Sequence, residues 1–158
     1  MSRLVIVVGS PILAFDPMLS HWAHLFLHDA FCREDPDTII VTRNASPAEL
    51  WAWEQAHACG LDRVIIGMDG MCWSSRDDPW RWPTGKEPPT LERATEVLLS
   101  LITLRMAGGF SAEVWSLEVE GYEMVDPLLP LARRLQIPIC PYPVTPPPFL
   151  AALALAGE

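Results

Sequence analysis

Residues 4–17 read LVIVVGSPILAFDP, and this stretch decides the predicted fold. Its first five residues are an unbroken run of aliphatic, mostly β-branched side chains, which is typical of a strand buried on both faces of a parallel sheet. Gly9 and Ser10 end the run. Asp16 followed by Pro17 is typical of a helix N-cap with proline at the first helical position. The stretch therefore predicts a central strand, a loop and the start of a helix.

The rest of the chain continues this alternation of strands and helices. Further strands are predicted over 38–42, 63–68, 113–119 and 137–140, and helices over 18–33, 47–58, 91–107 and 124–135. We therefore expect one Rossmann-like three-layer α/β domain over residues 1–144, with a parallel sheet of about five strands and helices on both faces. A proline-rich C-terminal extension is expected over 145–158.

The composition excludes several classes of protein. The chain of 158 residues has a formal net charge of −9 and a pI of about 4.8, which argues against nucleic-acid binding because that requires a basic surface. No run approaches the roughly 18 apolar residues of a membrane-spanning helix. The four cysteines form no closely spaced pair, so we expect free, buried thiols. Because the apolar run near the N-terminus is too short for a signal peptide, these features predict a cytoplasmic protein without membrane contact.

The order of elements over residues 3–144 resembles the SLOG superfamily of Rossmann-like domains. The segments that carry the resemblance are the strand ending in Gly9-Ser10, the segment SPAELWAWEQAHACGL at 46–61 and the segment ARRLQIPI at 132–139. The superfamily includes lysine-decarboxylase-like phosphoribohydrolases and domains of the DNA-processing protein A type. The resemblance implies a Rossmann-like fold.

The chain departs from the motifs of that superfamily at two places. Pro11 follows Gly9-Ser10, where such domains often carry arginine. The segment GGFSAE at 108–113 lacks the proline, the third glycine and the threonine of the phosphoribohydrolase motif. None of that family's catalytic residues is therefore assigned here, since a shared fold does not fix a function.

The loop at Gly9 and Ser10 is the first candidate ligand contact. Ligands of open α/β sheets bind beyond the carboxyl ends of the strands, where loop amides and helix N-termini can hold an anion. Gly9 would let the backbone approach a ligand closely, and Ser10 could donate its hydroxyl group. The alternative is an ordinary strand end and turn. The full G-x-G-x-x-G fingerprint is absent, which argues against a conventional dinucleotide site.

Residues 69–89, DGMCWSSRDDPWRWPTGKEPP, form the second candidate. The segment follows a predicted strand and is too long for an ordinary connection, which is typical of lids and binding loops. The indole of Trp73 can stack on a flat ring, and Arg76 and Arg81 can bind phosphate. Asp69 could bind a ribose hydroxyl group or transfer a proton. The alternative is a subunit interface, in which tryptophan and arginine are also enriched.

Three histidines, His21, His24 and His28, share one face of the predicted helix 18–33. Three imidazoles can bind zinc, but the first and last of these lie about 10 Å apart along the helix axis, so His24 and His28 are the easier pair. No cysteine or carboxylate is evidently placed to complete the set. The sequence therefore favours half-exposed histidines beside the apolar face and predicts neither a metal nor a cofactor.

The leading functional prediction is binding of a nucleotide or nucleotide-derived small molecule at the carboxyl edge of the sheet. The residues expected to line this site are Gly9, Ser10, Asp69, Trp73, Arg76 and Arg81. Hydrolysis of a glycosidic or phosphate bond is left open, because no catalytic set is recognisable from residue spacing. The alternative is a non-catalytic assembly or interaction protein, phage-encoded or host-associated, that uses the segments 69–89 and 145–158 as interfaces. Seven tryptophans and an apolar tail favour a homo-oligomer under either reading.

Overall fold

The run of aliphatic side chains at residues 4–8 forms the central strand of the sheet. In the computed structural model, which describes residues 2–43, 45–66, 72–74 and 90–144, strand β1 (Arg3–Gly9) pairs with a neighbouring strand on each side. Its side chains from Leu4 to Val8 are completely buried. Burial on both faces is why this strand has no alternation of polar and apolar residues.

The described residues form one six-stranded sheet with the order β4-β3-β2-β1-β5-β6. Five of these strands run parallel, and β4 pairs antiparallel with β3 at one edge. After β1 the elements are the short 3₁₀ helix η1 (Pro11–Ala14), α1 (Pro17–Cys32), β2 (Thr38–Arg43), α2 (Pro47–Ala58), β3 (Asp62–Ile66), β4 (Cys72–Ser74), α3 (Leu91–Ala107), β5 (Ser111–Glu118), α4 (Leu128–Arg134) and β6 (Ile139–Pro143). This is the expected Rossmann-like α/β architecture.

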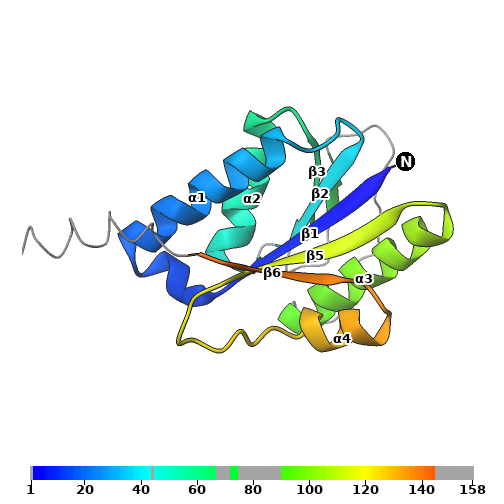
Figure 1. The fold of residues 1–158 in the computed structure, drawn as a ribbon. Coiled ribbons are helices and arrows are strands. Elements are labelled where there is room, and N and C mark those ends of the chain that lie inside the picture. The colour runs from blue at the N-terminus through cyan, green and yellow to red at the C-terminus, as the bar shows by residue number, and fades with distance from the viewer. Residues whose placement is uncertain (1, 44, 67–71, 75–89, 145–158) are drawn as a thin grey trace, which may run out of the picture.

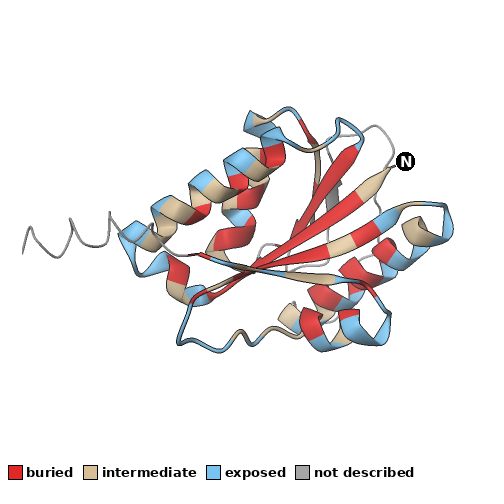
Figure 2. Ribbon diagram, in the orientation of Figure 1, coloured by how far each residue is buried: buried red, intermediate tan, exposed pale blue. Residues whose placement is uncertain are grey.

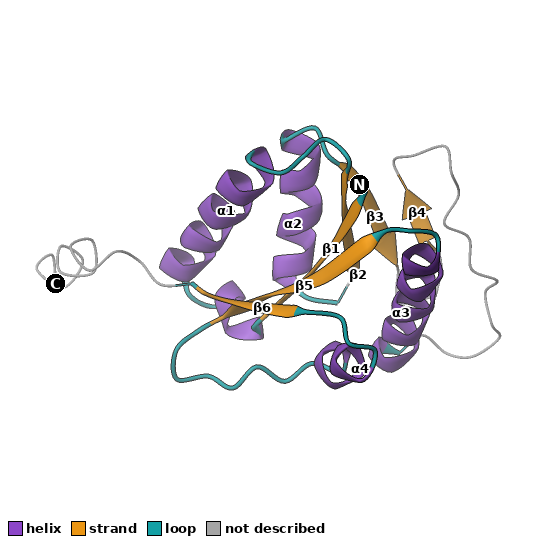
Figure 3. Cartoon of the chain, turned by 45° about the vertical axis from the view of Figure 1, so that its right-hand side comes forward, coloured by secondary structure: helices purple, strands orange, loops and turns teal. Residues whose placement is uncertain are grey.

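Two pairs of helices cover the two faces of the sheet, as Figures 1 and 3 show. Leu4, Ile6 and Val8 belong to the apolar core on the face of α3 and α4. Val5 and Val7 belong to the core on the face of α1 and α2. Successive side chains of a strand point to opposite faces, so one unbroken apolar strand supplies both cores. Figure 2 shows the burial concentrated along the central strands and the inner faces of the helices.

Helix starts follow the capping residues that the sequence predicts. The Asp16 carboxylate accepts hydrogen bonds from the backbone N–H groups of Met18 and Leu19 at the start of α1. Ser46 and Thr90 cap α2 and α3 in the same way. These side-chain oxygens satisfy N–H groups that have no partner inside the helix, which is a local effect that a sequence can predict.

Several predicted boundaries are wrong. Helix α4 begins at Leu128 and not at 124, because the residue before a proline is disfavoured in helical conformation and Asp126 precedes Pro127. Strand β6 begins at Ile139 and extends through Pro141 and Pro143. It lies at the sheet edge, where a proline without an N–H group is tolerated. The third strand begins at Asp62, one residue before its predicted start, and ends at Ile66. Its predicted end at 67–68 lies outside the described residues.

The segment 69–89, expected to be without regular structure, contains strand β4. Its backbone pairs with β3 through Ile65 and Trp73. The remaining residues of the segment, and the extension 145–158, lie outside the described residues. None of the helices in the described ranges combines the length and apolar character needed to cross a membrane.

Candidate functional site

The strand order places a topological switch point between β1 and β5. The chain leaves β1 toward α1 on one face of the sheet, whereas it leaves β5 toward α4 on the other face. The two strands are parallel neighbours, with Gly9 paired to Leu117 at their carboxyl ends. In open α/β sheets, ligands bind outside the carboxyl ends of the strands at this kind of point. We call the side of the sheet where the parallel strands end the carboxyl edge, and the opposite side the amino edge.

Ser10 lies at this switch point and is buried. Its backbone N–H group donates a hydrogen bond to the carbonyl of Leu117, 2.9 Å away, which joins the loop after β1 to β5. Only 4% of Ser10 is exposed. The loop is therefore held in place by the sheet itself, and a ligand contact by Ser10 stays a prediction.

Gly9 is required by packing against helix α2. A Cβ atom at this position would lie 2.3 Å from the Cβ atom of Ala48, far inside van der Waals contact. Glycine lets the first turn of α2 approach the end of β1 closely. A close approach at Gly9 was expected for a ligand, and the close approach that the structure shows is that of Ala48 on α2.

Of the other four predicted ligand residues, the structure describes the backbone position of one. Asp69, Arg76 and Arg81 lie outside the described residues. The backbone of Trp73 lies on β4, the outermost strand of the sheet, which pairs antiparallel with β3. Two of the six predicted residues, Gly9 and Ser10, therefore have a described position at the carboxyl edge.

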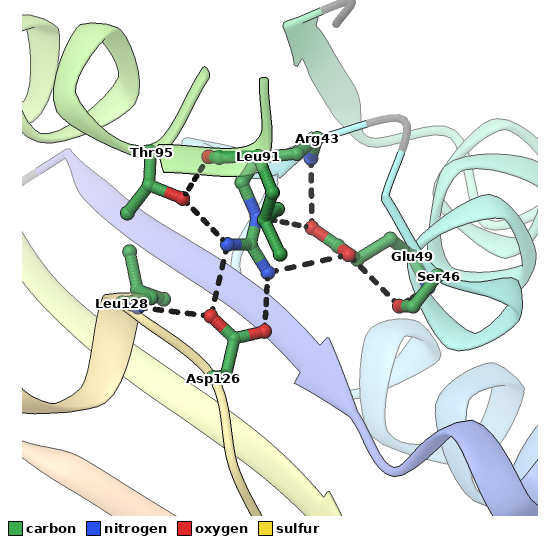
Figure 4. A network of polar contacts seen from close by, with 7 residues as sticks. All are labelled: Arg43, Ser46, Glu49, Leu91, Thr95, Asp126 and Leu128. Atoms are coloured by element: carbon green, nitrogen blue, oxygen red, sulfur yellow. Dashed lines mark hydrogen bonds and ion pairs between the residues drawn. The ribbon is translucent and has the colours of Figure 1, made fainter. Parts of the chain in front are cut away.

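A buried ionic network that was not predicted from the sequence lies at this same edge and is drawn in Figure 4. Arg43 is the last residue of β2 and is completely buried. Its Nε and Nη2 atoms donate hydrogen bonds to the carboxylate of Glu49 in the first turn of α2, at 2.8 and 3.3 Å. Its Nη1 and Nη2 atoms donate to the carboxylate of Asp126, at 2.9 and 2.7 Å. Nη1 also donates to the hydroxyl oxygen of Thr95 on α3, at 2.8 Å.

These contacts use all five N–H groups of the guanidinium. No donor of Arg43 is left for a ligand phosphate. The residue therefore acts as a brace that connects β2, α2, α3 and the segment before α4 at the carboxyl edge. We call Arg43, Ser46, Glu49, Thr95 and Asp126 the Arg43 network.

Charge and burial set the protonation of this network. Burial raises the pKa of Glu49 above its ordinary value, because desolvation of the carboxylate outweighs the attraction of Arg43 and its hydrogen bonds to the protein. The pKa of Arg43 is raised as well: desolvation alone would lower it, but the charges and hydrogen bonds of Glu49 and Asp126 outweigh that effect. Two carboxylates therefore face one guanidinium in this buried network.

A signal for part of this network was present in the sequence. Arg43 directly follows the predicted strand 38–42, and the ends of parallel strands meet at one edge of the sheet. Glu49 fits the capping-box pattern that begins at Ser46, but its carboxylate accepts hydrogen bonds from the Ser46 hydroxyl and from Arg43, including the Arg43 backbone N–H group. Asp126 and Thr95 are distant in sequence, and nothing local relates them to Arg43.

The three histidines of α1 have separate surroundings. His21 is exposed. The ring of His24 packs against Trp51, with 4.5 Å between ring centroids, and its Nδ1 atom lies 2.8 Å from the carbonyl oxygen of Ser20. His28 is exposed and lies beside two cysteines, Cys32 and Cys59. His24 and His28, the pair that spacing alone made the easier one for a metal, therefore do not share their surroundings.

The cysteines are less buried than expected. Cys32 is exposed, and Cys59 and Cys140 are half-buried free thiols. Cys32 is the last residue of α1 and Cys59 directly follows α2, so both lie where helices end near the surface. Burial raises the pKa of the Cys59 thiol to about 12, with further contributions from the hydrogen bond and charge of Cys32.

Comparison with known proteins adds no relative. No protein-family model, no curated protein and no solved structure matches the chain. The functional argument therefore rests on the residues and their geometry.

Proposed function

We propose that the protein binds a nucleotide or nucleotide-derived small molecule at the carboxyl edge of its sheet, where β1 and β5 end. The single observation that supports this is the strand order, which makes these two ends a topological switch point. Ser10 and the Arg43 network lie at that edge. The network supports the site by holding α2, α3 and the segment before α4 in fixed positions, and it does not bind the ligand itself.

In this proposal, residues of the segment 69–89 bind the phosphate and the base of the ligand. Arg76 and Arg81 would bind phosphate, because Arg43 has no free donor. Trp73 would stack on the base, and Asp69 would bind a ribose hydroxyl group. Strand β3, which precedes this segment in the chain, is a parallel strand and ends at the carboxyl edge.

We also propose that the chain is a SLOG-type domain of the cytoplasm. The predicted order of elements and the free thiols at Cys32, Cys59 and Cys140 support this assignment. Binding is proposed without a committed reaction. The Ser46 hydroxyl group at the carboxyl edge donates to the Glu49 carboxylate, but that carboxylate also binds Arg43. Hydrolysis of a glycosidic or phosphate bond would therefore require residues of the segment 69–89.

Thermal unfolding in the presence of nucleosides, nucleotides and ADP-ribose-like compounds tests the proposal. A ligand that binds only the folded protein, at a hundredfold excess over its dissociation constant, stabilises it by about 2.7 kcal/mol. We expect Trp73→Ala and Arg76→Ala to abolish the stabilisation. Arg134→Ala is the matched control, because Arg134 is exposed in the last turn of α4, at the amino edge.

Two results would contradict the proposal. One is the absence of stabilisation by every compound of the panel. The other is a stabilisation that Trp73→Ala and Arg76→Ala leave as large as Arg134→Ala does. Either result would favour an interaction protein over a nucleotide-binding protein.

An interaction protein is the second candidate, and exposed apolar side chains favour it. Phe15 is 79% exposed and Val125 is 78% exposed, and Tyr122 is also exposed. All three lie in connections that leave the carboxyl ends of β1 and β5. Self-association through this surface would bury them, so light scattering should report a homo-oligomer that Phe15→Ser and Val125→Ser dissociate. A monomer at all concentrations would exclude self-association through this surface.

A further inference from the structure

Two helices bring three metal-binding side chains together at the amino edge of the sheet. His28 and Cys32 are one turn apart at the end of α1, and Cys59 directly follows the end of α2. The ligand atoms of these three residues all lie within 4.8 Å of one another, and they are the only such group of His, Cys, Asp or Glu within the ranges that the structure describes. We infer that His28, Cys32 and Cys59 bind a zinc ion, at a site separate from the proposed ligand site.

The distances suit a single ion after a small adjustment. The Sγ atoms of Cys32 and Cys59 are 2.8 Å apart, and Sγ of Cys32 lies 3.6 Å from Nε2 of His28. Zinc binds thiolate sulfur at about 2.3 Å and imidazole nitrogen at about 2.0 Å, in a tetrahedral arrangement that sets neighbouring ligand atoms roughly 3.5 Å apart. Zinc binding therefore requires the two sulfur atoms to separate by about 0.7 Å. It also requires Sγ of Cys59, which lies 3.7 Å from Nδ1 of His28, to move toward Nε2 of the same ring. Small side-chain rotations provide this, because Cys32 is exposed and Cys59 is half-buried.

Gln55 orients the imidazole ring for this role. Its Oε1 atom lies 2.8 Å from Nδ1 of His28, so Nδ1 carries the proton and donates it to the amide oxygen. The lone pair is then on Nε2, the atom that faces Cys32. Metal-binding histidines almost always donate their other ring N–H group to a carbonyl, a carboxylate or water. Gln55 lies on α2, four residues before Cys59, and His28 lies on α1, four residues before Cys32, so the two pairs have the same spacing.

The chemistry of the donor set favours zinc over a disulfide. A Cys32–Cys59 disulfide would use both sulfur atoms and leave the orientation of His28 by Gln55 without a role. Two thiolates and one imidazole are ligands that zinc accepts, with a fourth position for water or another donor. That fourth position faces solvent here, because His28 and Cys32 are exposed. The spacing of the histidines argued against a metal because no cysteine was evidently placed beside them. The fold places two cysteines, Cys32 and Cys59, beside His28.

A bound ion would connect the ends of α1 and α2. Both thiols must lose their protons to bind zinc, so binding at neutral pH releases about two protons per ion. The unfolded chain does not hold the three ligands together, and the ion therefore stabilises the folded state in proportion to its concentration above the dissociation constant.

The first experiment uses the full chain after reduction and removal of metals with a chelator. Zinc is titrated in competition with a chromophoric chelator, and cobalt(II) is titrated separately as a spectroscopic probe. We expect one ion per chain, a thiolate-to-cobalt charge-transfer band with the visible bands of a tetrahedral site, and a thermal midpoint that rises with zinc concentration.

Single substitutions test which residues bind the zinc ion. Cys59→Ser and His28→Gln should weaken zinc binding by more than about 100-fold, and Gln55→Ala by about 10- to 100-fold, as expected when a metal ligand loses its hydrogen-bond partner. The matched controls are Cys140→Ser, at a half-buried free cysteine on β6, and His21→Gln, at an exposed histidine of α1. Both controls should bind zinc like the wild type. Circular dichroism identifies any variant that fails to fold, and Gln55→Ala tests the site without touching a ligand.

Three outcomes would overturn the inference. The first is a reduced, folded chain that binds no zinc in competition with the chelator. The second is a Cys59→Ser or His28→Gln variant that folds and binds zinc as tightly as the control variants. The third is a chain that forms the Cys32–Cys59 disulfide with oxidised glutathione and, once reduced again, shows no cobalt charge-transfer band.

Discussion

Thr42 carries a buried hydroxyl group that has no hydrogen-bond partner among the described residues. An unpaired buried hydroxyl costs about 1–3 kcal/mol relative to water. Thr42→Val replaces the hydroxyl with a methyl group, so we expect the free energy of unfolding in urea to rise by about 1 kcal/mol. Thr38→Val is the matched control on the same strand, because the Thr38 hydroxyl donates to Glu34 and its loss should lower stability. A loss of stability in Thr42→Val would contradict the expectation.

Glu49 makes the stability of the protein depend on pH. Burial raises its pKa above the ordinary value of 4.5 in the folded state, so the folded protein holds this proton more tightly than the unfolded chain does. The contribution of Glu49 to stability is therefore complete below about pH 4.5 and is lost as pH rises through the raised pKa. Glu49→Gln carries an amide in place of the protonated carboxyl group and should remove this dependence.

The measurement is the free energy of unfolding of the wild type and Glu49→Gln from pH 4 upward. We expect the wild type to lose stability relative to the variant as pH rises. Parallel pH profiles would show that folding does not shift the pKa of Glu49, and a wild type that gains stability relative to the variant would show that folding lowers it. Either result would contradict the prediction.

At the scale of elements, the contact of α2 with β1 depends on the absence of a side chain at Gly9. Gly9→Ala would place a Cβ atom 2.3 Å from Cβ of Ala48, so α2 must shift. Overpacking of this kind costs about 1–3 kcal/mol. Ala48→Gly removes the opposing methyl group, at a cost of up to about 1 kcal/mol for glycine in a helix.

A double-mutant cycle tests this contact. The double variant Gly9→Ala/Ala48→Gly should be more stable than the sum of the single changes predicts, by at least about 0.5 kcal/mol. Urea unfolding of the four proteins gives the coupling energy. Additive effects would mean that α2 does not press on the end of β1.

At the scale of the whole molecule, the sheet order predicts where the fold is most resistant to opening. Strand β1 has a partner on both sides and completely buried side chains from Leu4 to Val8. Strand β6 lies at the edge and is partly exposed. Amide hydrogen exchange measured by NMR should therefore be slowest in β1 and markedly faster in β6. Equal protection of the two strands would contradict this gradient.

Local chemistry explains which parts of this architecture could be predicted. The caps at Asp16, Ser46 and Thr90 satisfy neighbouring backbone N–H groups, so their sequence patterns are sufficient. The start of α4 depends on Pro127, and the extent of β6 depends on prolines that an outermost strand tolerates. The pattern of apolar residues alone predicted both boundaries wrongly. Asp69, Arg76 and Arg81 lie outside the described residues, and Trp73 has a position through the backbone of β4.

The sequence by itself determined the strand–helix alternation and the central place of the buried strand at residues 4–8. Ligand binding at the carboxyl edge stays a prediction. Only the tertiary structure decided which distant side chains meet. Arg43 and Asp126 are 83 residues apart in the chain, and Cys32 and Cys59 are 27 apart. The physical reason is that hydrophobic periodicity and capping act within a few residues, whereas a buried ion pair or a metal site needs groups that converge only after helices pack on the sheet.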